Sequence, residues 1–526
     1  MSSVASERVR LAELVALLSL GTDLGLGQPM EHMIRACLIA LRLGERLDLA
    51  ESERGVVYYS GLLAWVGCHT DAYEQAKWFG DDTILKRDAH YEFDLGRAGP
   101  TISFMLKHVG GPERSLATRA RVGIAFPGEG LRAMKALAEN HYRATDELVR
   151  RLGLGKEVRE SLRQTYERWD GKGAYGMKGE EIAVSSRLIN LADVVEVFGR
   201  TGGVEAAMTV ARERSGTQFD PNLVEAFCEQ APMVLAELDE TPSWEAVIAA
   251  EPALFREIAG EELDLALEAI GEFAELKSPS IMGHVHAVRE LVTEAAASLG
   301  LPTADAELRR AACVYDLGRL GVPNAVWDKP GPLTQAEQER VRLHPYLSER
   351  MLRCSPALEG LGGIAVEHHE RLDGSGYPRG VSGDEIGTSA RLLAAADVYQ
   401  ALREPRPHRP ARAAHEAAIE LRREVSAGRL DGEAVSLVLR AAGHRVGRRR
   451  EWPADLTTRE VEVLRLLARG LSNKQIAEQL VISPKTAGSH VEHIYRKIGA
   501  SNRAQASVFA LRHGLMRDAA AAPDAS

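Results

Sequence analysis

Two stretches of this chain, roughly 200 residues apart, carry the same residues in the same order. Glu167–Gly173 (ERWDGKG) matches Glu370–Gly376 (ERLDGSG), and Arg187–Val194 (RLINLADV) matches Arg391–Val398 (RLLAAADV). Because the matches keep one order over the length of a whole domain, they indicate tandem duplication of a domain rather than a solenoid of short repeats.

Both copies have the residue pattern of helices. Apolar residues recur at helical spacing, as at Val285, Val288, Leu291 and Val292, and no window of the chain shows sustained alternation of apolar and polar residues. We find no βαβ pattern and no GxxxxGK phosphate-binding loop. The sequence therefore predicts an all-α fold, with two tandem helical bundles followed by a small helix-turn-helix domain.

The length of 526 residues leads us to expect about three domains. An acidic, helix-prone stretch separates the two copies, and a basic run (GHRVGRRREWP) follows the second copy. The predicted parts are a degenerate first helical domain (1–236), a connecting helical segment (237–258), a second helical domain (259–442), a basic linker (443–453), the helix-turn-helix domain (454–516) and a disordered tail (517–526).

Charge and cysteine usage limit the class of protein. The net charge of -10 argues against nucleic-acid binding by the whole surface, so any DNA contact must come from a local basic face. The five cysteines have no paired spacing, which indicates reduced thiols rather than a disulfide framework. The first residues form no apolar signal segment, and no apolar run reaches the ~18 residues of a membrane span. We therefore expect a soluble cytoplasmic protein.

The stretch Val366–Pro378 (VEHHERLDGSGYP) carries the strongest chemical signal. It places two adjacent imidazoles, His368 and His369, just before a glycine-rich turn, and Asp397 follows on an apolar run. Adjacent imidazoles suit two neighbouring metal ions better than one catalytic base. Imidazole and carboxylate together suit Fe, Mn or Zn chemistry on phosphate esters.

The second copy, from about Ala259 to Ala442, resembles the HD-GYP family, metal-dependent phosphodiesterases of the HD superfamily that typically cleave cyclic di-GMP. The resemblance implies a compact helical bundle with metal ions at its centre. It is carried by Gly283-His284, Tyr315-Asp316-Leu317-Gly318, Lys329–Thr334 (KPGPLT), His344-Pro345, His368-His369-Glu370, Asp373–Pro378 (DGSGYP) and Asp397.

The resemblance also implies roles for single residues and a divalent metal, Fe, Mn or another. The implied metal ligands are His284 and Asp397 for one ion, Asp316 as the bridge, and His344, His368 and His369 for the second ion. Asp316 and Arg319 are the implied catalytic residues, and the implied substrate contacts are Arg319, Gly376, Tyr377 and Pro378.

The chain departs from the family pattern at the residues that give the family its name. The His-Asp pair of the family is Tyr315-Asp316 here, and a phenol with a pKa near ~10 is a poor substitute for imidazole at a divalent metal. The lysine that usually follows is Arg319, while Ser280 and Gln400 stand where some members have Glu and Asp. We expect an ion at the three-histidine half, with only one ion bound if the other half is lost. Whether hydrolysis survives stays open.

The first copy has lost more of the pattern. Ala64-Trp65 stands at the His-Asp pair and Thr165-Tyr166 at the His-His pair, whereas His32, His141 and Asp193 remain. Three scattered ligands rarely make a metal site. We expect this copy to pack against the second one, to dimerise or to sense a ligand.

The C-terminal segment predicts a helix-turn-helix. Thr457 and Glu460 form a capping box at the start of one helix, and Gly470 ends that helix. Ser483 caps a later helix that has Pro484 at its first position. This last helix has a basic, hydrogen-bonding outer face near its N-terminus, which fits the major groove of DNA.

From Leu456 to about Leu515 the chain closely resembles the LuxR-type (NarL/FixJ-type) DNA-binding domain. The resemblance is carried by Leu471–Ala477 (LSNKQIA), Ser483–Thr486 (SPKT), His490-Val491 and Arg496–Gly499 (RKIG). It implies a homodimer on double-stranded DNA, with a dimer surface on the final helix. The implied DNA contacts are Lys485, Thr486, Ser489 and His490 in the groove, with Lys474 and Lys497 near phosphates.

Together these features predict a DNA-binding transcriptional regulator with an HD-GYP-like sensory body that binds metal and a cyclic dinucleotide or another phosphate ester. The alternative is an active metal-dependent cyclic di-GMP phosphodiesterase with a DNA-binding output domain. The substitution at Tyr315 separates the two hypotheses, because two-metal hydrolysis requires both ions to be held.

Overall fold

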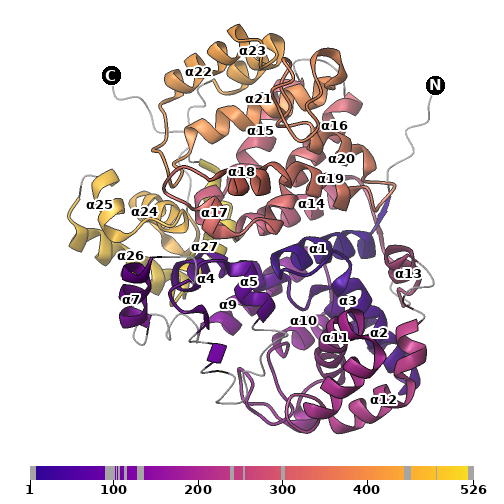
Figure 1. Cartoon of the computed structure of the whole chain (residues 1–526). Helices are drawn as coiled ribbons and strands as arrows, with labels where there is room; N and C mark the ends of the chain where they lie inside the picture. The colour runs from indigo at the N-terminus through magenta and orange to yellow at the C-terminus, as the bar shows by residue number, and fades with distance from the viewer. Residues whose placement is uncertain are drawn as a thin grey trace. The chain divides into compact units, whose positions relative to one another are not determined.

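The computed structural model of the chain is almost entirely helical (Figure 1). In the described residues, the strands are the short antiparallel pair β1 (Val9–Arg10) and β2 (Glu257–Ile258). The predicted all-α class is confirmed. The described residues are 8–88, 101–126 with gaps at 102, 105–106 and 112–114, 136–252 with gaps at 237 and 239–241, 255–297, 302–443, and 452–518 with a gap at 481. Most of the predicted basic linker (443–453) and of the predicted tail (517–526) lies outside them.

The chain divides into two compact units, Met1–Ala266 and Leu267–Ser526. The predicted connecting segment contains α13 (Ser243–Ala249) and β2. Because β2 pairs with β1 near the N-terminus, this segment closes the first unit rather than standing apart from it. Helix α14 (Gly260–Glu275) then runs across the division into the second unit.

In the first unit, α2 packs against α3 and α11, and α1 packs against α3. Helix α11 bends at Gly203, whose φ of 76° is a left-handed conformation that glycine adopts readily. Besides β1, β2 and α13, the elements described in the first unit are α1 (Leu11–Gly25), α2 (His32–Arg46), α3 (Glu51–Leu63), η1 (Val66–His69), α4 (Ala72–Phe79), α5 (Asp82–Arg87), α7 (Leu116–Ala125), α9 (Leu137–Arg151), α10 (Lys156–Arg163), η4 (Gly179–Glu181), α11 (Val184–Glu213) and α12 (Pro221–Ala236).

In the second unit, α15 packs against α16, α21 and α23, and α19 packs against α20. Of the periodic apolar residues on α15, Val285, Val288 and Val292 are buried, whereas Leu291 is half-buried. The elements that precede the C-terminal domain are η6 (Pro279–Ile281), α15 (His284–Ala297), α16 (Pro302–Val314), η7 (Leu317–Gly321), α17 (Asn324–Trp327), α18 (Gln335–Arg342), α19 (His344–Leu352), α20 (Glu359–Val366), η8 (Gly383–Glu385), α21 (Thr388–Arg403), α22 (Ala414–Ser426) and α23 (Gly432–Ala441).

The order of helices around the conserved positions of the repeat is the same in both units. His32 begins α2 as His284 begins α15, and Asp193 lies within α11 as Asp397 lies within α21. In the same order, α3, α9 and α10 of the first unit match α16, α19 and α20 of the second. This agreement supports the predicted duplication.

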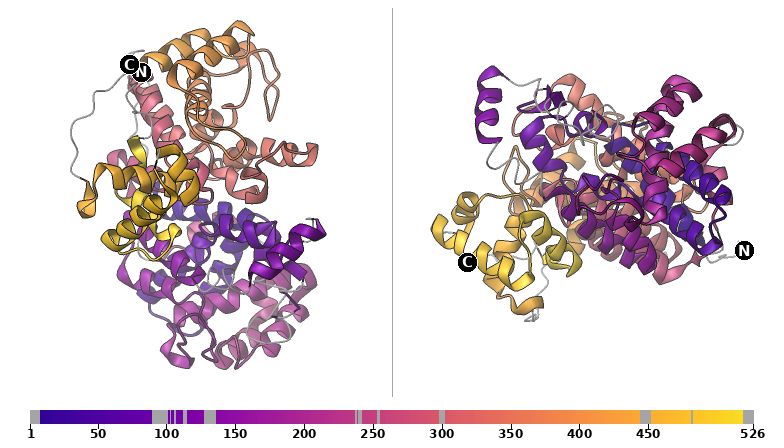
Figure 2. Two further views of the ribbon diagram at one scale, coloured as in Figure 1. Left: turned by 90° about the vertical axis from the view of Figure 1, so that its left-hand side faces the viewer. Right: turned by 90° about the horizontal axis from the view of Figure 1, so that it is seen from below.

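The C-terminal domain consists of short helices with strong local start signals, and Figure 2 shows them in yellow from two further directions. The predicted capping box is present, since Thr457 accepts from the Glu460 backbone N–H and Glu460 accepts from that of Thr457. Ser483 caps α26 (Pro484–Ile498), as predicted. The elements are η9 (Pro453–Asp455), α24 (Thr458–Ala468), α25 (Asn473–Leu480), α26 (Pro484–Ile498), α27 (Arg503–Arg512) and η10 (Leu515–Asp518).

Candidate metal centre

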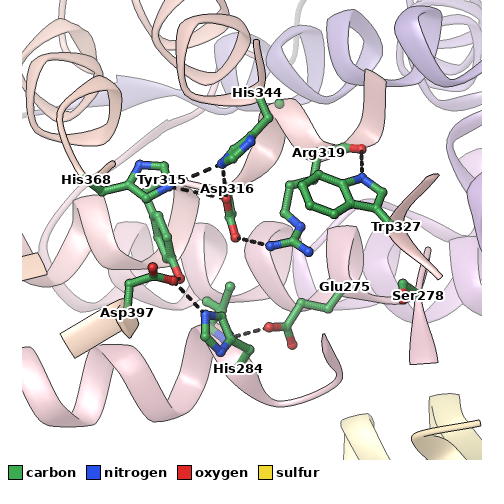
Figure 3. A network of polar contacts seen from close by, with 12 residues as sticks. Glu275, Ser278, His284, Tyr315, Asp316, Arg319, Trp327, His344, His368 and Asp397 are labelled. Atoms are coloured by element: carbon green, nitrogen blue, oxygen red, sulfur yellow. Dashed lines mark hydrogen bonds and ion pairs between the residues drawn. The ribbon is translucent and has the colours of Figure 1, made fainter. Parts of the chain in front are cut away.

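The residues predicted as metal ligands come together in the second helical domain. Figure 3 shows His284, Asp316, His344, His368 and Asp397, and a ligand atom of His369 lies within 4.8 Å of those of His344 and His368. They come from elements far apart in the sequence, and most lie at an end of a helix, where a side chain can turn inward. His284 begins α15, Asp316 follows α16, His344 begins α19, His368 and His369 follow α20, and Asp397 lies within α21. His284, His344 and His368 are almost completely buried.

The three-histidine half of the centre has the geometry of a metal site. One ligand atom each from His344, His368 and His369 lies within 4.8 Å of the others. The Nδ1 atoms of His344 and His368 each lie 2.6 Å from a backbone carbonyl oxygen, of Val341 and Ala365. Each Nδ1 therefore donates, and in the neutral imidazole the opposite Nε2 keeps its lone pair.

Asp316 turns one oxygen toward these lone pairs. Its Oδ1 lies 3.1 Å from Nε2 of His344 and 3.7 Å from Nε2 of His368, and it is buried without a hydrogen-bond donor. Burial lowers the pKa of His368 to about 4, so this imidazole is neutral near pH 7. A buried oxygen that faces unprotonated nitrogens is an arrangement that a cation would stabilise, so these residues fit a divalent metal.

The other half of the centre is closed by a phenol. His284 Nε2 lies 3.0 Å from Asp397 Oδ1, and the hydroxyl of Tyr315 donates to the same oxygen at 3.1 Å. Tyr315 is completely buried. Burial and the nearby Asp397 raise the pKa of this phenol well above its usual value, so it is a hydrogen-bond donor and not an anionic ligand. This half offers fewer metal ligands than the three-histidine half.

Sequence reasoning missed Glu404, which lies 2.9 Å from Nδ1 of His284. Burial alone would lower the pKa of His284, but Glu404 and Asp397 raise it to about 10. Glu404 follows Asp397 by two helical turns, so their spacing was a signal that could have found it. Gln400, one turn earlier, donates to the second oxygen of Glu404 at 2.7 Å. Ser280, at the other departure from the family pattern, bonds to Ser278 and Asp328.

Arg319 lies on the side of Asp316 that faces away from the histidines. Its Nη1 donates to Asp316 Oδ2 at 3.0 Å, and its guanidinium carbon lies 3.8 Å from the ring centre of Trp327. The indole N–H of Trp327 in turn donates to the backbone oxygen of Arg319. Burial alone would raise the pKa of Asp316, but the guanidinium holds it well below its usual range.

The glycine-rich turn packs against the three-histidine half. The ring centres of Tyr377 and His369 lie 4.7 Å apart, with an angle of 30° between the ring planes. The guanidinium carbon of Arg342 lies 5.8 Å from the ring centre of Tyr377. A side chain on Gly376 would collide with the backbone of Glu370, so the turn requires glycine there. The predicted substrate residues Gly376, Tyr377 and Pro378 thus lie beside the predicted metal ligands.

In the part of the first unit that the structure describes, no histidine cluster is found at the equivalent region. His141 lies among Trp65, Tyr166 and Cys68, and its Nε2 donates to the backbone oxygen of Ala64 at 3.0 Å. Aromatic packing has replaced the ligands here. Among the described residues, the clusters with metal-site geometry both lie in the second unit: the three histidines, and a buried group of Glu268, Glu272 and His286.

The predicted DNA-binding residues lie on α25 and α26. Lys485, Thr486 and Ser489 are exposed on one face of α26, His490 is half-buried, and Lys474 is exposed on α25. The inner face of α26 is formed by buried Ala487, Val491 and Ile494. Lys497 differs, because its Nζ donates to the buried Glu460 at 2.7 Å and so connects α26 to the capping box of α24.

Comparison with known families agrees with this division. Residues 268–434 match the HD domain family, and residues 454–510 match the luxR family of bacterial regulatory proteins. The chain is 34% identical over 415 residues to 3'3'-cGAMP-specific phosphodiesterase 3 of Vibrio cholerae, covering 78% of this chain and 90% of that protein. The chain belongs to the HD-domain family of cyclic-dinucleotide phosphodiesterases. It combines this body with a LuxR-type domain, as the sequence predicted.

Two further relatives support the family. A crystal structure of a cyclic GMP-AMP-specific phosphodiesterase from V. cholerae superimposes with a TM-score of 0.57 at 29% identity, covering 82% of this chain and 98% of that one. The cyclic di-GMP phosphodiesterase response regulator RpfG of Xanthomonas campestris is 37% identical over 143 residues, 27% of this chain and 37% of that protein. Within the described parts of this HD-domain protein, we find no helix with the length and apolarity needed to cross a bilayer.

Proposed function

We propose that the protein is a cytoplasmic transcriptional regulator that binds double-stranded DNA through its C-terminal domain. Its second helical domain binds one divalent ion, Fe or Mn, together with a cyclic dinucleotide. The observation that carries this proposal is the unequal division of the centre. His344, His368 and His369 offer three converging imidazoles, whereas the phenol of Tyr315 donates a hydrogen bond to Asp397 in the other half.

The proposed ion would be held by the three histidines and Asp316. When bound, a metal ion supplies Lewis-acid polarisation of a phosphate ester and activation of water. Tyr377, stacked beside His369, would contact a nucleotide base, and Arg342 next to it would contact a phosphate. With one ion, the centre would bind the nucleotide more readily than it would cut it. In a two-metal site, the two ions stabilise the attacking oxygen and the leaving oxygen of an in-line displacement.

The second candidate is an active cyclic-dinucleotide phosphodiesterase with a DNA-binding output domain. The observation that favours it is the 34% identity to a cGAMP-specific phosphodiesterase across 90% of that protein. One purified sample separates the two candidates if metal content, binding of cyclic di-GMP and 3'3'-cGAMP, and release of linear product are all measured with Mn²⁺ or Fe²⁺ supplied. We expect binding with negligible product. Robust turnover by the wild-type protein would establish the second candidate instead, and binding of neither nucleotide would overturn the sensory role.

The DNA-binding part of the proposal depends on α26. Replacing the exposed Lys485 with Ala should weaken binding to a promoter fragment by about tenfold, because it removes a contact to a base or a phosphate. Gel shifts against fragments of the host genome would measure this. Lys156→Ala, at an exposed lysine of the first unit, is the matched control. Equal shifts for Lys485→Ala and wild type would show that α26 is not the recognition helix. Sedimentation with and without DNA would test the proposed homodimer.

A further inference from the structure

Arg319 is a fixed positive charge in the interior of the metal centre. Its side chain is only 16% exposed, and it is held between the Asp316 carboxylate and the Trp327 ring. The backbone oxygen of Arg319 accepts a hydrogen bond from the indole N–H of Trp327, so Trp327 contacts both the backbone and the guanidinium of Arg319. These contacts keep the guanidinium inside the centre rather than extended into solvent.

The guanidinium of Arg319 donates a hydrogen bond to one oxygen of Asp316, the carboxylate that would bridge two ions. Asp316 Oδ1 faces the Nε2 atoms of His344 and His368, whereas Oδ2 accepts from Arg319 at 3.0 Å. A carboxylate that bridges two ions gives one oxygen to each. Here the oxygen on the far side from the three histidines is given to a guanidinium.

The remaining space around this guanidinium is small. A cavity with room for about one water molecule is lined by His284, Asp316, Arg319 and Glu275, among others. A divalent ion in that cavity would lie beside the guanidinium in a poorly solvated place, where like charges repel strongly. The cavity is thus large enough for an ion, but the Asp316 oxygen that would hold an ion there is already bonded to the guanidinium.

The first copy supports a coupling between the carboxylate and the guanidinium. The position of Asp316 is Trp65 there, and the position of Arg319, three residues later, is Cys68. Both charges are therefore absent together in the copy that lacks the histidine cluster, and both are present together in the copy that has it. The family usually has a lysine at this position, but the planar guanidinium of Arg319 can bond to Asp316 and stack on Trp327 at the same time.

We propose that the Arg319 guanidinium takes the place of the first metal ion, so that the centre holds a single ion by construction. Arg319 is a positioning residue in this role: it balances Asp316 and keeps that carboxylate directed at the three histidines. This inference rests on the metal-binding part of the proposed function. It also means that the loss of the histidine at position 315 is only half of the change, and that returning histidine there does not restore a second ion.

The decisive measurement is the metal content of two variants. Tyr315→His and the double variant Tyr315→His/Arg319→Gln are loaded with Mn²⁺, freed of excess ion and analysed by mass spectrometry for metal per chain. We expect the double variant to hold about one more ion than Tyr315→His. Equal metal content in the two would overturn the proposal. Arg353→Gln in the Tyr315→His background removes a half-exposed arginine that pairs with Glu349 and Glu359, and serves as the matched control.

A spectroscopic measurement on Tyr315→His keeps the proposal testable if the double variant does not fold. A single bound Mn²⁺ gives an uncoupled paramagnetic resonance signal, whereas two bridged ions give an exchange-coupled one. We expect the uncoupled signal in Tyr315→His as in the wild-type protein, because Arg319 is unchanged. A coupled signal that appears in Tyr315→His but not in the wild-type protein would overturn the role of Arg319 alone, whereas a coupled signal in the wild-type protein would count against the single ion of the proposed function as well. Nucleotide binding is measured separately, so its absence would count against the proposed function and not against the role of Arg319.

Discussion

The two copies of the helical domain share a His–Asp contact and differ in the residues that surround it. In the first copy His32 Nε2 lies 3.0 Å from Asp193, and in the second His284 Nε2 lies 3.0 Å from Asp397. Among the residues that the structure describes, only those of the second copy form the three-histidine cluster. The His–Asp contact therefore persists where no metal site is formed. It joins two helices of the fold, and its presence alone is no evidence of metal chemistry.

The far nitrogen of this histidine is also held in both copies, but by carboxylates from different positions. Glu196, three residues after Asp193, lies 2.6 Å from Nδ1 of His32. Glu404, seven residues after Asp397, lies 2.9 Å from Nδ1 of His284. The carboxylate and the residue that bonds to it have exchanged positions between the copies. Arg200, four residues after Glu196, contacts that carboxylate in the first copy, whereas Gln400, four residues before Glu404, contacts the carboxylate in the second.

The largest difference between the copies should appear in metal binding. His368→Ala removes an imidazole whose Nε2 lies 3.3 Å from that of His344, and should weaken Mn²⁺ binding by at least about 100-fold. Thr165→Ala, at the equivalent position of the first copy, should leave binding unchanged. Isothermal titration with Mn²⁺ measures both variants. If His368→Ala retained the ion, or Thr165→Ala lost it, the functional division between the copies would be wrong.

Removing the shared contact from the first copy should cost stability without affecting metal. In Asp193→Ala, the buried His32 loses one of its carboxylate partners, and breaking a buried pair costs about 3 kcal/mol. Urea unfolding followed by the fluorescence of the first unit's tryptophans, which include buried Trp65, would report it. A parallel loss of bound metal would show that the first copy is itself a metal site.

Local signals in the sequence predicted the parts of the structure that depend on neighbours in the chain. The capping box of Thr457 and Glu460 and the N-cap Ser483 were found because a few adjacent residues specify each of them. The β1–β2 pair was not predicted, because each strand has two residues and its partner lies near the other end of the unit. So short a strand has no pattern of its own.

The ligand set was predicted because family motifs mark its members, but the way charges are shared within it was not. The i, i+3 spacing of Asp316 and Arg319 permits an ion pair between them, but it does not decide whether the guanidinium bonds inward to Asp316 or remains available for substrate. The Glu404–His284 contact joins residues 120 positions apart. The spacing from Asp397 places Glu404 on the same side of the chain, but the packing of α21 against α15 is what identifies its partner. These contacts decide which half of the centre suits a metal ion.

A smaller effect should appear in the pH dependence of the first unit. Burial alone would lower the pKa of His32, but the hydrogen bonds to Asp193 and Glu196 raise it to about 10 from its usual 6.5. A raised pKa means that the charged imidazole stabilises the fold fully below about pH 6.5 and that this contribution is lost as the pH rises toward 10. Asp193→Asn should flatten this part of the stability profile, measured by urea unfolding between pH 6 and pH 10. An unchanged slope would show that His32 is neutral.

The smallest effect should come from moving the second carboxylate to its first-copy position. Glu404→Gln removes the partner of His284 Nδ1 and should destabilise the second unit by about 1 kcal/mol, the usual net value of one hydrogen bond. Adding Gln400→Glu returns a carboxylate at the position that Glu196 occupies in the first copy, and should recover most of that loss. Thermal unfolding of the two variants would compare them. If the double variant were no more stable than Glu404→Gln, the two carboxylates would not be equivalent, and each copy would have acquired its own way of holding the histidine.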